Sequence, residues 1–272
     1  MAPFPKIRGV IGVVHLPPLP GDPLHDGVQS FLDVETFALR DAEALTKGGV
    51  DAILVENFGS APFAKGTHGS RLAPHGVATL AIVAREIART TSLPVGVNCL
   101  RNDAISSLGI AAAAGLSFIR VNVHVGAYVT DQGVIEGEAD RSLRYRAALG
   151  ARSVAILADV LVKHAAPLAH VDATRATHDT LHRGLADAVV VTGEATGISV
   201  DVSRLRAVHD AAGDAPVFIG SGLTPHSAAR LCSLADGAIV GTYVKERGDV
   251  RERVDESRVR MLVEATRGQW RS

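Results

Sequence analysis

The feature that most constrains this chain is an eightfold alternation of short apolar segments with longer helix-like segments. Strands that are apolar on both faces and separated by helices are typical of a parallel sheet covered by helices. Eight such units predict an α/β fold, a single closed (β/α)8 or TIM barrel, with a doubly wound open sheet as the alternative. The eight predicted strands are Val10–His15, Ala52–Asn57, Pro94–Cys99, Phe118–Val123, Ser153–Asp159, Ala188–Thr192, Pro216–Ser221 and Gly237–Thr242.

The segments between the strands have the spacing of amphipathic helices. In His75–Arg89, apolar residues recur every three or four positions, which indicates one buried helix face. Further helices are predicted over Val34–Gly48 and Asp201–Ala212. Glycines follow helical stretches at Gly48-Gly49, Gly115 and Gly184, where a left-handed cap favours glycine.

Length and linker composition favour one domain. The 272 residues contain no Pro/Gly/Ser-rich linker, so a single barrel domain is expected over 1–272. A short N-terminal arm at 1–8 and a C-terminal tail at 267–272, frayed at its end, should flank it. Two segments, Gly59–Pro74 and His124–Glu138, are long for connections in a compact domain and are expected to be functional loops.

Charge and composition narrow the class of protein. The net charge is −1 and 4% of residues are aromatic, so a nucleic-acid binder is not expected. Cys99 and Cys232 lie far apart in apolar segments, as reduced core thiols do. The sequence shows no signal peptide and no stretch of about 20 apolar residues, which predicts a cytoplasmic protein without membrane insertion.

Polar residues stand where the predicted strands end. In a barrel, the carboxyl ends of the strands form the mouth where active sites lie. Arg120 and Asn122 share one strand face, because side chains alternate with a period of two, and their apolar neighbours should face the helices. The residues predicted to meet at the mouth are His15, Glu56, Asn98, Arg120, Asn122, Asp159 and Thr192.

These residue types suit acid–base chemistry on a small molecule. Asp159 and Glu56 are candidates for the acid–base pair, and Lys163 could join them or form a Schiff base. Arg120 and the asparagines could hold hydroxyl groups or developing negative charge. The alternatives are structural: an ion pair between Glu56 and Arg120, a loop cap by Asp159, and a solvated turn at Lys163.

Glycine-containing turns follow the seventh and eighth predicted strands. Such turns let backbone N–H groups approach an anion, and a following helix adds the positive end of its dipole. Barrels commonly bind phosphate at this place. The alternative is two tight turns that need glycine for their own geometry. The predicted phosphate-binding residues are Gly220, Ser221, Gly222, Gly241 and Thr242.

Metal and cofactor motifs are weak. His15 and His124 lie at strand ends, where a hydrogen bond to substrate suits them better than metal ligation. Asp131 and Glu136 could reach a substrate or a divalent ion, or could simply be solvated. No nucleotide-binding, nucleophile-elbow or zinc-protease motif is present, so the sequence identifies no cofactor with certainty and leaves a divalent metal ion as an open alternative.

Long motifs on these strand ends resemble the BtpA/SgcQ family of bacterial and archaeal barrel proteins. The resemblance runs from about residue 7 to about residue 266. It implies a barrel fold but no single reaction: one branch is linked to photosystem I biogenesis and another lies among sugar-metabolism genes. The motifs that carry it are Gly12–Gly21, Val55–Phe63, Val97–Asp103, Phe118–His124, Val129–Gly137, Ala158–His164 and Gly220–Gly222.

Two function classes follow. The first is an enzyme that isomerises, cleaves or transfers a glycosyl group on a phosphorylated sugar or nucleotide-like molecule. The second is a non-catalytic assembly factor, which should have an exposed apolar patch for a partner and has no use for converging polar side chains in a barrel mouth. A homo-oligomer is expected in either case.

Overall fold

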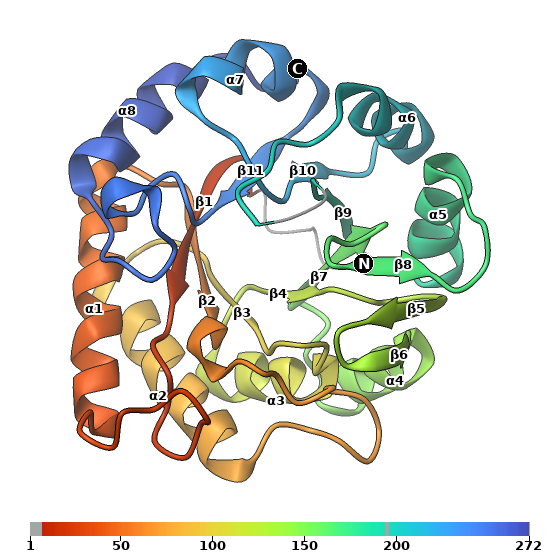
Figure 1. Cartoon of the computed structure of the whole chain (residues 1–272). Coiled ribbons are helices and arrows are strands. Elements are labelled where there is room, and N and C mark those ends of the chain that lie inside the picture. Colours follow the sequence, from red (N-terminus) through yellow and green to blue (C-terminus); the bar gives the residue numbers. More distant parts are fainter. Residues whose placement is uncertain (1–6, 194–195, 272) are drawn as a thin grey trace.

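Eight parallel strands close into a barrel in the computed structural model, which describes residues 7–193 and 196–271 (Figure 1). Strand β1 pairs with β2 on one side and with β11 on the other. The predicted closed barrel is therefore confirmed, and the open sheet is excluded. The barrel strands, in the order in which they pair, are β1 (Gly9–His15), β11 (Gly237–Val240), β10 (Val217–Ile219), β9 (Ala188–Val191), β7 (Ala155–Val160), β4 (Phe118–Val121), β3 (Val95–Asn98) and β2 (Ala52–Glu56).

Helices surround the barrel, and their boundaries follow local signals. The predicted helix at 34–48 begins earlier, at Phe31, because Ser30 and Asp33 form a reciprocal capping box. The main helices are α1 (Phe31–Gly48), α2 (Pro74–Thr90), α3 (Ala104–Ala114), α4 (Ala139–Ala148), α5 (Ala173–His178), α6 (Val202–Ala212), α7 (Pro225–Leu231) and α8 (Glu256–Thr266). Short helical turns lie at η1 (Phe58–Ser60), η2 (Asp179–Arg183), η3 (Cys232–Leu234) and η4 (Glu246–Gly248).

Apolar side chains fill the barrel interior beneath the carboxyl ends of the strands. Phe118 and Phe218 are completely buried there. Each requires a glycine beside it, because a Cβ on Gly96 would lie 2.4 Å from the Phe118 ring and a Cβ on Gly237 2.8 Å from the Phe218 ring. A second apolar layer packs between the strands and the helices. The polar strand-end residues therefore sit on a solid hydrophobic floor.

The predicted loop at His124–Glu138 is instead an antiparallel hairpin. Strands β5 (Ala127–Thr130) and β6 (Gly133–Glu136) pair with each other, and β8 (Ala165–Pro167) joins them in a small sheet beside the barrel mouth (Figure 1). Tyr128 and Ile135 turn inward and pack in a small apolar cluster. The alternation around Asp131-Gln132-Gly133 is the hairpin signal in the sequence.

Of the predicted glycine caps, Gly49 and Gly115 are left-handed, with φ of 91° and 71°. The prediction for Gly184 is wrong, because its φ is −82° and its ψ −14°. Glycine is needed there for space: a Cβ would lie 2.6 Å from Val125 Cγ1 and 2.8 Å from Thr180 O.

The expected fraying of the C-terminal tail is also wrong for its described residues. Arg271 forms an ion pair with Asp236 at 2.8 Å, and its amide donates to Ala235 O. Trp270 packs against the outer apolar layer. Both cysteines are free and buried, as predicted.

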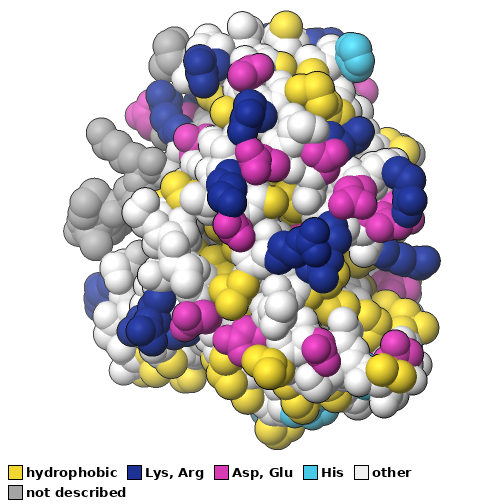
Figure 2. All heavy atoms as spheres, turned by 90° about the vertical axis from the view of Figure 1, so that its left-hand side faces the viewer, with side chains coloured by type: hydrophobic (Ala, Val, Ile, Leu, Met, Phe, Trp, Pro, Cys, Tyr) yellow, Lys and Arg dark blue, Asp and Glu magenta, His cyan; other side chains and the backbone are white. Residues whose placement is uncertain are grey.

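The outer face over α1, α2 and α8 carries basic and acidic side chains side by side (Figure 2). Pairs such as Lys47–Glu43 and Arg260–Glu256 account for part of this mixture. Hydrophobic side chains gather at the lower edge of the same view. Among residues 7–193 and 196–271, no helix is both long and apolar enough to cross a bilayer.

Candidate functional site

A cavity of about 480 Å³ opens at the carboxyl ends of the barrel strands, at the place that the polar strand ends predict. Its wall combines charged groups with apolar side chains such as Phe58, Phe63 and Ile239. The predicted site residues that line it are His15, Glu56, Asn98, Arg120, Asn122, Asp131, Lys163, Gly220, Ser221, Gly222, Gly241 and Thr242. Asp159, Thr192 and His124 lie outside this lining.

Arg120 forms the centre of a buried polar network on the cavity floor. Its Nε and Nη2 each donate to Asp159, at 3.0 Å, in a bidentate pair. Its Nη1 lies 3.4 Å from Oε1 of Glu56. Burial alone would lower the pKa of Arg120, but the two carboxylates outweigh it and raise that pKa. The guanidinium is thus a fixed cation.

Glu56 is a fixed carboxylate. Burial alone would raise its pKa, but His15 and Arg120 lower it to about 2. Asn98 Nδ2 donates to Glu56 Oε1 at 2.9 Å, and His15 Nε2 lies 3.6 Å from Oε2. A carboxylate with so low a pKa is a weak proton acceptor near neutral pH, so Glu56 is suited to orienting and stabilising positive charge.

Asp159 lies beneath the cavity rather than on its wall. Its side chain is fully shielded from solvent, and its oxygens are taken up by Arg120 and by Asn122 Nδ2, which donates at 3.0 Å. This arrangement gives Asp159 a positioning role toward two cavity residues. Thr192 plays a similar part, because its Oγ1 accepts a hydrogen bond from the Lys163 amide at 2.9 Å.

Lys163 places a half-buried side chain on the cavity wall. Burial, followed by the positive charge of Arg120, lowers the pKa of Lys163 to about 8, although Glu56 and Asp159 oppose the shift. Among the described residues, no carboxylate forms an ion pair with its amine. Lys163 is therefore the cavity amine that can be neutral near physiological pH.

Two buried polar atoms on the cavity wall have no hydrogen-bond partner among the described residues: His15 Nδ1 and Asn122 Oδ1. Burial lowers the pKa of His15 and outweighs the opposing effect of Glu56, so its ring is neutral. Unsatisfied buried polar atoms are costly, and a ligand hydroxyl could satisfy both. His124 Nδ1 also lacks a partner among the described residues, but His124 lies outside the cavity, where its Nε2 contacts Gly184 O at 2.8 Å.

The two glycine turns line the cavity beside β10 and β11. The Gly220 amide continues the sheet by donating to Val191 O at 2.7 Å. The amides of Ser221, Gly222, Gly241 and Thr242 find no acceptor among the described residues. The Ser221 hydroxyl is already used, since it accepts from Gly193 N and donates to Ile198 O.

Sequence reasoning missed two arginines on the cavity wall, Arg101 and Arg258. Arg101 Nη2 donates to the carbonyls of Lys163 and His164, and its Nε lies 3.4 Å from Asp131 Oδ1. Arg101 therefore ties the hairpin tip to the loop after β7. Arg101 lies in the motif Val97–Asp103, so the sequence did contain a signal that could have identified it.

Arg258 projects from α8 at the opposite side of the mouth. Its guanidinium lies 4.6 Å from the centre of the Tyr243 ring, and its Nε donates to Tyr243 O. No carboxylate among the described residues forms an ion pair with the side chain. A helical arginine carries no distinguishing sequence pattern, so nothing in the sequence marked it.

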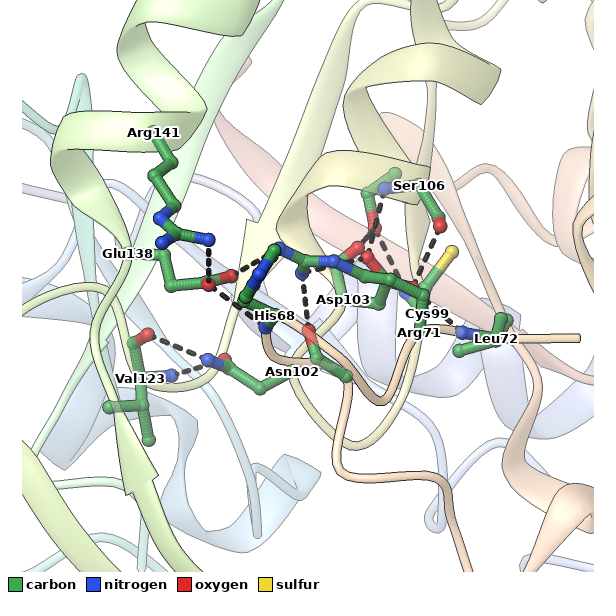
Figure 3. Close-up of polar contacts among 12 residues, drawn as sticks. His68, Arg71, Leu72, Cys99, Asn102, Asp103, Ser106, Val123, Glu138 and Arg141 are labelled. Atoms are coloured by element: carbon green, nitrogen blue, oxygen red, sulfur yellow. Dashed lines mark hydrogen bonds and ion pairs between the residues drawn. The ribbon is translucent and has the colours of Figure 1, made fainter.

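The predicted functional loop at 59–74 is pinned at the rim by a separate polar cluster (Figure 3). Arg71 pairs with Asp103 at 3.1 Å and with Glu138 at 2.6 Å. Asp103 also caps α3 and accepts from Leu72 N. This cluster holds the loop that carries Phe63 into the cavity.

Among the described residues, no group of three or more His, Cys, Asp or Glu side chains is arranged to hold a metal ion.

Comparison with known structures agrees with the architecture. The phosphoribosyl anthranilate isomerase of Thermus thermophilus superposes with a TM-score of 0.56 at 13% identity, covering 94% of this chain and 97% of that one. A similarity at this level of identity shows the barrel fold alone.

Sequence comparison identifies the family. The photosystem I biogenesis protein BtpA of Synechocystis is 45% identical over 262 residues, which cover 96% of this chain and 89% of that protein. The putative sgc region protein SgcQ of Escherichia coli is 30% identical, with 94% and 93% covered. The BtpA family model matches residues 6–268. With this match over nearly its whole length, the chain belongs to the BtpA family.

Proposed function

We propose that this protein is an enzyme acting on a small phosphorylated compound, sugar-like or nucleotide-like, by an isomerase- or lyase-type reaction. The observation that carries the proposal is the charge pairing of the cavity. Arg101 and Arg120 are paired with carboxylates, whereas Lys163 and Arg258 have no such partner among the described residues. Unpaired cations in a concave site favour an anionic ligand.

The phosphate fits best at the turns after β10 and β11. Four backbone amides there have no acceptor within the described part of the chain, and Arg258 lines the cavity nearby, where its Nε donates to Tyr243 O. A Cβ on Gly222 would lie 2.3 Å from Ile198 O, and one on Gly241 would lie 2.4 Å from the His15 ring. Only glycine therefore lets these amides lie where they do, which supports a cradle for an anion.

The reacting carbons would then lie over Lys163, Glu56 and Arg120. A partly neutral amine can accept the proton of the carbon next to a carbonyl in isomerisation, or the proton of the hydroxyl group in aldol-type cleavage, and both reactions then pass through an enolate. Arg120 can stabilise the enolate oxygen, while His15 and Asn122 can bind hydroxyl groups. Asp159 would act through Arg120 and Asn122 rather than on the substrate.

The first test measures thermal stability with inorganic phosphate, ribose 5-phosphate and dihydroxyacetone phosphate. A ligand at about 100 times its Kd adds about 2.7 kcal/mol, enough to raise the Tm by several degrees. Thr242 lines the cavity. Thr242→Asp should abolish the shift by repelling the phosphate, whereas the uncharged control Thr242→Asn should retain most of it. A flat response from the folded wild-type protein would contradict the proposal.

One observation favours the second candidate, a non-catalytic assembly factor. Hydrophobic side chains are exposed just before α1 and in its first turn, with Val28 85% and Leu32 68% accessible. The Synechocystis relative is named for photosystem I biogenesis. If none of the phosphate compounds raises the Tm of the folded protein, the assignment moves to this candidate.

A further inference from the structure

We propose that Lys163 forms a covalent imine with an aldehyde or ketone carbon of the substrate. The inference rests on the proposed function and deepens it, because it restricts the substrate to phosphorylated carbonyl compounds. The proposal begins with the position of this amine. Lys163 lines the cavity, whereas Lys47 is paired with Glu43 on the surface and Lys245 is paired with Asp41 in the core.

The groups around Lys163 favour a neutral amine. Arg120 and Arg101 contribute positive charge nearby, and the neighbouring His164 has its own pKa lowered by burial and by Lys163. The acidic groups facing it are Glu56 and Asp159, and both are already engaged by Arg120. An amine must be unprotonated to attack a carbonyl carbon, so this environment suits a nucleophile.

The backbone around Lys163 is held in place. Its amide donates to Thr192 Oγ1, and its carbonyl accepts from Arg101 Nη2 at 3.2 Å. The flanking residues Leu161 and His164 adopt left-handed backbone angles, with φ of 51° and 56°. Such angles are costly for residues other than glycine and tend to be retained at functional sites.

The chemical step balances without an oxidant or reductant. The Lys163 nitrogen adds to the carbonyl carbon, and the carbonyl oxygen takes up a proton to give a carbinolamine. Loss of that hydroxyl with one nitrogen proton releases water and leaves a C=N bond. In this route Lys163 is the nucleophile and solvent water is the base. The protonated imine accepts the electron pair of the adjacent C–H bond, whose proton passes to water, or of the adjacent C–C bond, whose hydroxyl-bearing carbon loses its hydroxyl proton to water and leaves as an aldehyde. The enamine carbon is then protonated, and attack of water on the C=N bond releases the product and the free amine. Glu56 is placed to stabilise the iminium charge.

The experiment traps the imine by reduction. The protein is incubated with sodium cyanoborohydride together with one carbonyl probe at a time: dihydroxyacetone phosphate, pyridoxal 5′-phosphate or unphosphorylated glyceraldehyde. The adducts are then located by peptide mass mapping. The sequence has five lysines, Lys6, Lys47, Lys65, Lys163 and Lys245, so the map is simple. Lys47 is the internal control, because its ion pair with Glu43 raises its pKa.

We expect labelling of Lys163 at pH 8 to be at least about tenfold faster than labelling of Lys47, with a rate that rises through about pH 8. Lys163→Arg should keep the charge, the fold and phosphate binding but lose the adduct. Labelling spread equally over Lys47, Lys65 and Lys163 would overturn the imine.

Two outcomes separate this inference from the proposed function. If phosphate stabilises the protein through Thr242 but none of the three carbonyl probes labels Lys163 selectively, the imine is wrong and the phosphate site stands. If glyceraldehyde labels Lys163 as fast as the phosphorylated probes do, and phosphate does not compete, the imine stands and the phosphorylated substrate is wrong.

Discussion

Glu56 both lines the cavity and stabilises the folded protein. Its pKa is held at about 2, well below the ordinary value of 4.5, by His15 and Arg120 acting against burial. A carboxyl whose folded pKa is depressed stabilises the protein fully above its unfolded pKa, and this stabilisation is lost as the pH falls toward the folded value. Glu56 should therefore contribute about 3 kcal/mol that disappears between about pH 4.5 and pH 2.

Glu56→Gln tests this prediction by urea unfolding at pH 7, 4.5 and 3. The variant should be about 2–3 kcal/mol less stable at pH 7, because Arg120 loses one of its two buried partners, and the difference should shrink in acid. The surface variant Glu43→Gln is the control and should change stability little at any pH. An unchanged acid dependence in Glu56→Gln would show that another group carries it.

Arg120 and Asn122 show which features of the site could be predicted from the sequence. The period-two alternation placed Arg120 and Asn122 on one face, and both line the cavity. The ion pair between Glu56 and Arg120, given as an alternative from the sequence, is present at 3.4 Å. The bidentate pair with Asp159 was not predicted, because Asp159 is 39 residues from Arg120 and only the three-dimensional packing brings the two together. For the same reason, only the structure could show that Lys163 has no ion-pair partner among residues 7–193 and 196–271.

At the scale of elements, strands and long helices were predictable because burial on one or two faces leaves a periodic pattern. The hairpin β5–β6 was missed, since its strands have four residues each and only Tyr128 and Ile135 are buried. The role of Gly184 was also mispredicted from local sequence. Its position after a helix suggested a left-handed cap, but glycine is required there because Val125, from a loop distant in sequence, packs too closely for a Cβ.

Gly184→Ala should therefore destabilise the protein although its backbone angles suit alanine. The added methyl group would collide with Val125 Cγ1 and Thr180 O, at an expected cost of about 1–3 kcal/mol. Gly76→Ala, within α2, is the matched control. Its Cβ would make ordinary contacts at 3.8 Å or more, and a stabilisation of about 0.5–1 kcal/mol is expected. Urea midpoints measure both, and equal midpoints for the two variants would refute the packing explanation.

In the whole molecule, two separate sets of contacts join the beginning of the barrel to its end. The strands close it through β1 and β11, and the outer layer closes through Asp41 of α1 and Lys245, which follows β11. Lys245 Nζ donates to Asp41 Oδ2 at 2.6 Å, and both residues are almost completely buried. Their separation of 204 positions hid this pair from any local pattern.

Lys245→Met should be among the most destabilising single changes away from the cavity. Burial lowers the pKa of Lys245 and Asp41 opposes this, so removal of the amine leaves an unpaired carboxylate in the core. The expected cost is about 3–5 kcal/mol. Asp41→Asn keeps the acceptor for Val254 N, so the double variant Asp41→Asn/Lys245→Met should cost about 2 kcal/mol less than the sum of the single changes. Urea unfolding of the four proteins gives this coupling energy directly, and strictly additive losses would mean that the ion pair between Asp41 and Lys245 does not stabilise the contact of α1 with the segment after β11.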